Sequence, residues 1–127
     1  MTPFAGGCQC GAVRWRASAA PRSAVCHCEN CRRAAGAQAV AWWIVPAEAF
    51  AFTDGKPATY TTAAGGRRSF CGLCGSQLTY VGQGRDHEVD ITAGSADDPG
   101  LFPPTGDSCI DERVPWVPLV ATDAETP

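Results

Sequence analysis

Seven of the eight cysteines in this chain lie in three short groups. The groups are Cys8/Cys10, Cys26/Cys28/Cys31 and Cys71/Cys74. Thiolates separated by one or two residues can bind one metal ion together, and zinc takes such ligands at about 2.3 Å in a tetrahedral arrangement. A glycine follows the first and the last group, at Gly11 and Gly75, and allows the backbone to turn around a metal with positive φ. The spacing therefore predicts a zinc protein with two metal sites and two zinc ions per chain.

The number of thiols in each group indicates how the ligands divide. A structural zinc takes four protein ligands, whereas a zinc with three protein ligands keeps one position open. We expect the two paired groups to form one closed site, with the ligands Cys8, Cys10, Cys71 and Cys74. The group of three would hold the second zinc, with the ligands Cys26, Cys28 and Cys31. Its fourth position would then accept water, a substrate thiol or a distant residue.

The two histidines and the remaining cysteine could also take part in chemistry. If Cys26 and Cys28 lie on an extended stretch, His27 points away from them, either supporting the ligands from behind or facing solvent. Cys109 is either a small buried thiol, the usual state of a free cysteine, or a fourth ligand that closes the second site. His87 lies in an acidic stretch and is expected at the surface.

A disulfide framework is the alternative use of an even number of cysteines, and it requires an oxidising compartment. Residues 1–7 have neither the basic nor the apolar region of a secretory signal. No stretch approaches the roughly 18 apolar residues of a membrane span. Cysteines one or two residues apart also rarely bridge one another without strain. We therefore expect reduced cysteines, a cytoplasmic location and no membrane partner.

The length of 127 residues predicts a single zinc domain, residues 1–120, followed by a C-terminal tail, residues 121–127. We expect a monomer or a homodimer. The net charge of −3 and the pI near 5.2 give no general attraction for phosphate backbones, so nucleic acid is not an expected partner. The arginine pairs at residues 32–33 and 67–68 are either solvated surface or sites of anion recognition.

The elements that must position the cysteines are mostly strands. Period-two alternation or short apolar runs predict strands over residues 12–18, 38–45, 50–52, 59–61, 69–70, 77–81 and 88–92. The side chains expected to face the core from the alternating strands are Val13, Trp15, Val89 and Ile91. Residues 50–52 and 59–61 flank the turn at 54–57 and are expected to pair as a hairpin.

A single short helix is expected over residues 29–35, ended by Gly36. Trp42 and Trp43 are neighbours on a strand and should face opposite ways. Five prolines lie between Asp97 and residue 120, so the last quarter of the chain is expected to be an irregular segment over the sheets. The predicted fold class is mainly β with one short helix.

Three ordered motifs resemble those of one known family. They are Gly7-Cys8-Gln9-Cys10-Gly11-Ala12-Val13, Cys26-His27-Cys28-x-x-Cys31 and Phe70-Cys71-x-x-Cys74-Gly75-x-x-Leu78. The chain is similar to the glutathione-dependent formaldehyde-activating enzyme family, also called the centromere protein V family, from Gly6 to about Trp116. The resemblance implies an Mss4-like, zinc-bound antiparallel β-sheet architecture.

The resemblance also implies roles for the cysteines. Those of the paired groups match the family's structural zinc ligands, while Cys26, Cys28 and Cys31 match the catalytic zinc ligands. The founding activity joins glutathione and formaldehyde, formally a carbon–sulfur lyase reaction in reverse. This implies a zinc enzyme that acts on a thiol or a thiol–aldehyde adduct, with glutathione as the expected partner. Arg32 or Arg33 would bind a carboxylate of the thiol substrate.

One segment departs from the family pattern. Many relatives show His-Ile-Trp or a similar segment ahead of the terminal Pro-Trp, where this chain has Asp107-Ser108-Cys109. An imidazole and an aromatic ring are missing, and Cys109 is available to close the second zinc. The alternative prediction is therefore a non-catalytic zinc scaffold that binds a partner. An exchangeable fourth ligand at the second metal would distinguish the enzyme from the scaffold.

Overall fold

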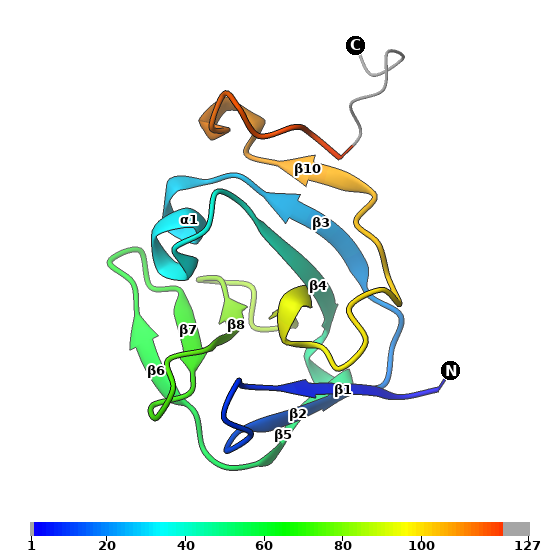
Figure 1. Ribbon diagram of the computed structural model, residues 1–127. Coiled ribbons are helices and arrows are strands. Elements are labelled where there is room, and N and C mark those ends of the chain that lie inside the picture. Colours follow the sequence, from blue (N-terminus) through cyan, green and yellow to red (C-terminus); the bar gives the residue numbers. More distant parts are fainter. Residues whose placement is uncertain (1, 121–127) are drawn as a thin grey trace.

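The computed structural model describes residues 2–120 and places them in two β-sheets with one α-helix (Figure 1). The small sheet has the strand order β1-β2-β5, and the large sheet has the order β10-β3-β4-β9-β8-β7-β6. The prediction of a mainly β fold with one short helix is confirmed. Within residues 2–120, no helix has the length and apolar composition that a membrane span requires.

The elements follow one another with short connections. The strands are β1 (Phe4–Gly7), β2 (Arg14–Ala17), β3 (Arg22–Cys26), β4 (Val40–Pro46), β5 (Phe50–Asp54), β6 (Ala58–Thr61), β7 (Arg67–Phe70), β8 (Gln77–Val81), β9 (Glu88–Thr92) and β10 (Gly106–Ser108). The helices are α1 (Glu29–Ala35) and three 3₁₀ turns, η1 (Ala47–Ala49), η2 (Ala93–Ser95) and η3 (Ile110–Glu112). All strand pairs are antiparallel except that of β10 with β3.

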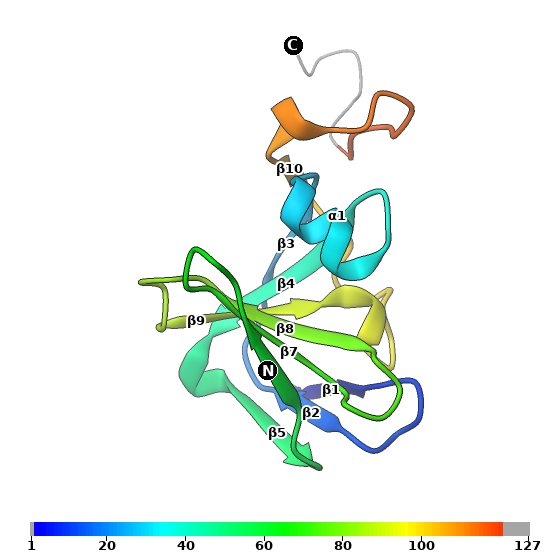
Figure 2. The ribbon, with the colours of Figure 1, turned by 90° about the vertical axis from the view of Figure 1, so that its left-hand side faces the viewer.

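The main core lies between the two sheets. Trp15 from the small sheet and Trp43, Leu78 and Ile91 from the large sheet are fully buried in one cluster. Phe4 joins the two sides, since its ring centroid lies 6.1 Å from that of Trp15 and 5.5 Å from that of Trp43. Figure 2 shows the small sheet below the strands of the large one. Val13 and Val89 are buried in the same cluster, so all four predicted inward residues lie in the core.

The adjacent tryptophans of β4 face opposite sides, as predicted. Trp43 packs in the main core, while Trp42 packs in a second cluster with Cys31 and Val40. Both side chains are buried, because α1 and the segment that follows it cover the far face of β4. The second cluster therefore brings Trp42 next to the helix that carries cysteines.

The predicted hairpin of residues 50–52 with 59–61 is wrong. β5 pairs with β2 in the small sheet, and β6 pairs with β7 in the large sheet. The Phe50 ring packs against Trp15 at a centroid distance of 6.1 Å, and Phe52 packs edge-on against Phe50. Aromatic burial against β2 therefore outweighs local pairing across the turn, and the chain crosses from one sheet to the other at Gly55.

The prediction that the chain after Asp97 has no regular strand is also wrong. β10 runs parallel to β3, with Gly106 opposite Ala24 and Ser108 opposite Cys26. The prolines flank this strand and do not interrupt it, so its backbone amides remain available for pairing. The predicted tail, residues 121–127, lies outside the described residues.

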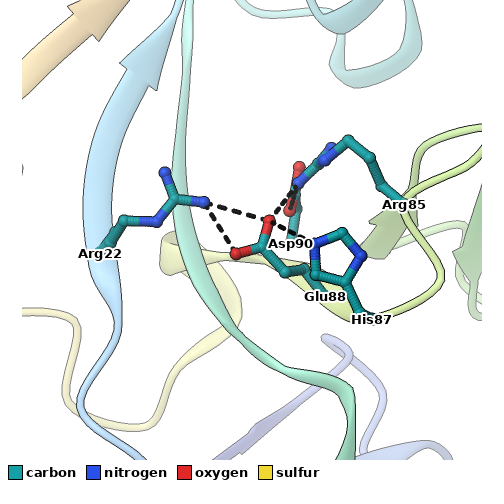
Figure 3. Close-up of polar contacts among 5 residues, drawn as sticks. All are labelled: Arg22, Arg85, His87, Glu88 and Asp90. Atoms are coloured by element: carbon teal, nitrogen blue, oxygen red, sulfur yellow. Dashed lines mark hydrogen bonds and ion pairs between the residues drawn. The ribbon is translucent and has the colours of Figure 1, made fainter.

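Charged side chains hold the beginning of β3 to the beginning of β9 across β4 (Figure 3). Arg22 Nη2 lies 3.1 Å from both carboxylate oxygens of Glu88. Arg85 Nη2 donates to Glu88 and to Asp90, at 3.1 Å in each case. His87 is exposed beside this network, as predicted.

Two carboxylates of this network should affect stability with opposite signs. Hydrogen bonding from Arg85 lowers the pKa of Glu88, so its contribution is present above the ordinary pKa and is lost as the pH falls. Burial raises the pKa of Asp90 even with Arg85 beside it, so its contribution is present at low pH and is lost as the pH rises. At pH 7 we expect Glu88→Gln to lower the melting temperature and Asp90→Asn to raise it. Each change should be about 1 kcal/mol or less in calorimetry of the metal-loaded protein. Equal destabilisation by both variants would contradict this assignment.

The crossing at Gly55 gives a second stability prediction. Gly55 has φ +70, and a Cβ there would overlap the carbonyl oxygen of Ala12. Gly84 has φ +77 but open space around its Cα, so it serves as the matched control. Gly84→Ala should cost about 1–2 kcal/mol, the cost of the left-handed conformation alone. Gly55→Ala should cost at least about 3 kcal/mol in urea denaturation, because backbone must also move. An equal loss of unfolding free energy in the two variants would show that the overlap with the Ala12 carbonyl does not destabilise the fold.

Candidate metal centres

The structure gathers four thiols from two distant turns into a first cluster. The Sγ atoms of Cys8, Cys10, Cys71 and Cys74 all lie within 4.8 Å of one another. Cys10 Sγ lies 3.7 Å from Cys8 Sγ and 3.8 Å from Cys71 Sγ. Four sulfurs at about 2.3 Å from one zinc ion stand about 3.8 Å apart in a tetrahedron. The donor set therefore fits a closed zinc site.

Both turns of the first cluster have the same local construction. Gly11 N donates to the carbonyl of Cys8, and Gly75 N donates to the carbonyl of Cys71. Both glycines have positive φ, 84° and 82°, as the sequence predicts. The left-handed glycine closes each turn, and amides within or directly after the turn donate to sulfur. The glycine after each group is thus a requirement of the turn.

Backbone amides stabilise the thiolate form of these cysteines. Val13 N donates to Cys8 Sγ at 3.2 Å, and this bond lowers the pKa of Cys8. Leu73 N and Cys74 N donate to Cys71 Sγ, both at 3.4 Å. Because a thiolate is the form that binds metal, these donors prepare the first cluster for a cation.

Ser76 links the two turns of the first cluster. Its Oγ lies 3.2 Å from Cys74 Sγ and lowers the pKa of Cys74 to about 5. The same Oγ accepts a hydrogen bond from Gln9 N at 3.0 Å. The serine was not singled out from the sequence, because its partner Gln9 lies in a turn remote along the chain.

Each of the two sheets contributes one pair of thiols to the first cluster. Cys8 and Cys10 follow β1 of the small sheet, while Cys71 and Cys74 lie between β7 and β8 of the large sheet. A metal bound there would cross-link the sheets at one edge of the main core, and its binding energy would also be folding energy.

A second cluster lies at the end of β3. The Sγ atoms of Cys26, Cys28 and Cys109 all lie within 4.8 Å of one another. Cys31 is the neighbouring thiol and hydrogen-bonds Cys26 and Cys28. Bonding to Cys31 lowers the pKa of Cys26 to about 4, whereas the pKa of Cys31 rises. Of the three predicted ligands of the second zinc, the structure places Cys26 and Cys28 in this group together with Cys109, and it places Cys31 beside the group.

Helix α1 positions two of these thiols. Cys28 is the N-cap in an extended conformation, and its Sγ accepts a hydrogen bond from Cys31 N at 3.3 Å. Cys31 lies one turn into the helix and is buried against Trp42. Gly36, with φ 64, ends the helix as predicted, and its amide donates to the carbonyl of Arg32.

Cys109 differs from the predicted buried thiol. It is exposed, and it is the one non-glycine residue among 2–120 with positive φ. Such a conformation costs an L-residue about 1–2 kcal/mol. Hydrogen bonding holds the residue there: His27 N donates to the carbonyl of Ser108, and Glu29 N donates to Glu112 Oε1 just after Cys109. Strain of this kind is typical of positions whose geometry serves a site.

His27 is also not at the surface, so the solvent-facing alternative is wrong. Its side chain is fully buried, and Nε2 lies 2.8 Å from Asp107 Oδ1, whose side chain is 2 % exposed. Asp107 also accepts a hydrogen bond from Val120 N. The pair joins β3 to β10 and so places Cys109 beside Cys26. The sequence marked Asp107 only as part of the segment that departs from the family pattern, and its pairing with His27 was missed because the two residues lie 80 positions apart.

The two arginines expected to bind substrate differ in their surroundings. Arg33 is largely exposed and pairs with Glu29 on the next turn at 2.8 Å. Arg32 has a buried Nε without a hydrogen-bond partner in the described chain, and it lines a shallow cavity of about 390 Å³ with Trp116. Neither guanidinium hydrogen-bonds a thiol of the second cluster within residues 2–120, so a substrate-binding role remains a proposal.

Comparison with known proteins identifies the family of this chain. The sequence profile described as glutathione-dependent formaldehyde-activating enzyme (GFA) matches residues 3–111. This chain belongs to the GFA family. No curated protein matches it. A solved structure of a Rhodobacter sphaeroides protein, determined in a structural genomics programme, is similar with a TM-score of 0.62 and 22 % identity. It covers 80 % of this chain and 100 % of its own, and at that identity the likeness shows the fold alone.

The two clusters of this GFA-family chain should respond differently to loss of a thiol. Cys74→Ser removes a ligand from the first cluster, so we expect loss of zinc together with loss of the folded, soluble state. Cys28→Ser keeps a side chain that can cap α1, so it should lower the zinc content by at most one ion and leave the fold intact. Zinc per chain by elemental analysis and near-UV circular dichroism measure the difference. A soluble Cys74→Ser protein with a full complement of zinc would refute the role of the first cluster.

Proposed function

We propose that this chain is a zinc-dependent enzyme of the carbon–sulfur lyase type that acts on a thiol or a thiol–aldehyde adduct such as that of glutathione. The observation that carries the proposal is the gathering of thiols at the exposed end of β3, where Cys26, Cys28 and Cys109 converge beside Cys31. Membership in the GFA family supports the choice of thiol chemistry. The reducing cytoplasm expected from the cysteine content would keep these thiols reduced.

The chain's residues have distinct roles in this proposal. Cys26, Cys28 and Cys31 would hold the second zinc, and Cys31 is the best shielded from solvent. Cys109 would be its fourth ligand. Zinc bound there would lower the pKa of a coordinated thiol and so supply a nucleophilic thiolate at neutral pH. Because Cys109 is exposed and in a left-handed conformation, it would be the thiol that gives way most readily to a substrate thiol.

The reaction balances without an oxidant or a reductant. The substrate sulfur adds to the carbonyl carbon of an aldehyde, a carbon–sulfur bond forms, and the proton released by the thiol goes to the aldehyde oxygen. The reverse reaction breaks the same bond. The buried side chains of Trp42 and Val40 exclude water from one side of the thiols. Arg32, with its unpartnered Nε, is the better candidate of the two arginines for a substrate carboxylate.

A second candidate function rests on the same four thiols. If Cys109 is a permanent ligand, the second site is closed and structural, and the protein is a zinc scaffold that binds a partner. Exposed apolar side chains on the segment after β10 favour this reading, since Ile110 is 50 % and Trp116 is 72 % exposed.

Native mass spectrometry with and without glutathione tests the proposal. We expect two zinc ions per chain, one glutathione on the wild-type protein, stronger binding by Cys109→Ser and no binding by Cys28→Ser. The same spectra give the number of chains per particle, which we expect to be one or two. Two zinc ions with uptake of glutathione only in Cys109→Ser would favour the scaffold. Equal uptake by metal-free protein would refute both the site and the mechanism.

A further inference from the structure

A cavity of about 670 Å³ lies between α1 and the β6–β7–β8 part of the large sheet. Both views show the helix next to the end of the β6–β7 hairpin (Figures 1 and 2). The residues that line it are Asn30, Arg33, Ala34, Tyr60, Thr62, Ala63, Arg68, Phe70, Gly75 and Gln77. A volume of about 300–1,000 Å³ is typical of sites for small molecules.

Arg68 is a buried charge in the wall of this cavity. Only 6 % of the residue is exposed, so of the two alternatives given for the arginine pairs, solvated surface does not apply to Arg68. Its Nη1 is buried and has no hydrogen-bond partner in the chain from 2 to 120. Its guanidinium carbon lies 4.6 Å from the ring centroid of Tyr80. This cation–π contact holds the guanidinium in place but does not neutralise it or satisfy its N–H groups.

The charges around the cavity are unbalanced. No aspartate or glutamate lines it, and no carboxylate of the described residues pairs with Arg68. Arg33 also lies at the rim, but its charge is paired with Glu29. The neighbouring Arg67 provides the contrast, since it lies on the other side of β7, is half exposed and pairs with Asp86. A buried guanidinium without an anion is costly, so a bound anion would lower the free energy of this part of the fold.

We propose that the Arg68 cavity binds the carboxylate of a small organic acid whose apolar part packs on Phe70 and Ala34. A guanidinium presents two parallel N–H groups that match the two oxygens of a carboxylate, so the planar acid fits better than a spherical ion. The apolar walls contribute through burial, and Gln77 is already engaged with the carbonyl of Ala34 and does not compete. The proposal rests on the charge and shape of the cavity and is independent of catalysis at the second cluster.

The probes are benzoate, its neutral isostere benzamide and phenyl phosphate, each titrated into the zinc-loaded full chain by calorimetry. We expect benzoate to bind at least about tenfold more tightly than benzamide, because a charge-assisted hydrogen bond is lost in the amide. Phenyl phosphate binding more tightly than benzoate would overturn the carboxylate assignment. Equal affinities of benzoate and benzamide, or no binding of either, would overturn the site.

Variants then locate the binding. Arg68→Gln should abolish the preference for benzoate, whereas Arg67→Gln on the same strand should leave it unchanged. Binding of benzoate that survives in Arg68→Gln would place the acid elsewhere, for example at a metal centre, and would overturn the proposal. Should Arg68→Gln fail to fold, the wild-type protein still decides: benzoate must shift the side-chain N–H resonances of Arg68 in NMR spectra, and benzamide must not.

Discussion

The structure depends on one cluster of four thiols to which each of the two sheets contributes a pair. The small sheet offers Cys8 and Cys10 from the turn after β1, and the large sheet offers Cys71 and Cys74 from the turn after β7. Each turn aims amides at sulfur, so both halves are prepared for a cation before they meet. A chain of this size buries a modest core, and a metal bound at the edge of that core would hold the two layers in register. The second cluster, at the end of β3, lies in the large sheet that the first cluster joins to the small one.

The second cluster is assembled from two segments that lie far apart in the sequence. Three of its thiols come from one short stretch, in which β3 runs into the cap and first turn of α1. The fourth is delivered by a three-residue parallel strand and a buried histidine–aspartate pair. A histidine between two cysteines therefore serves as a support for the strand opposite and not as a ligand from its own loop. The segment Asp107-Ser108-Cys109 supplies both the carboxylate that pairs with His27 and the thiol that joins the cluster.

The sequence was most informative where the physics is local. Cysteine spacing, the glycine after each turn, the helix over residues 29–35 and the opposite facing of Trp42 and Trp43 all follow from neighbours along the chain. The errors concern partners far apart in sequence. β5 leaves its expected hairpin because its aromatic rings pack on Trp15, and β10 forms because His27 and Asp107 meet in the core. Arg68 looked like half of a surface pair, since nothing in its neighbours reveals that α1 covers it.

The position of Cys109, directly after the last strand, also sets an order of assembly. All ligands of the first cluster are available once residue 74 has been synthesised, whereas the second cluster lacks its last thiol until β10 has emerged. Chains are made at about 5–20 residues per second, so the two centres become competent at different times. A nascent chain would therefore pass through a stage in which Cys26, Cys28 and Cys31 form an incomplete, accessible site. The second cluster is therefore completed late, when the segment that carries Cys109 has been made and has paired with β3.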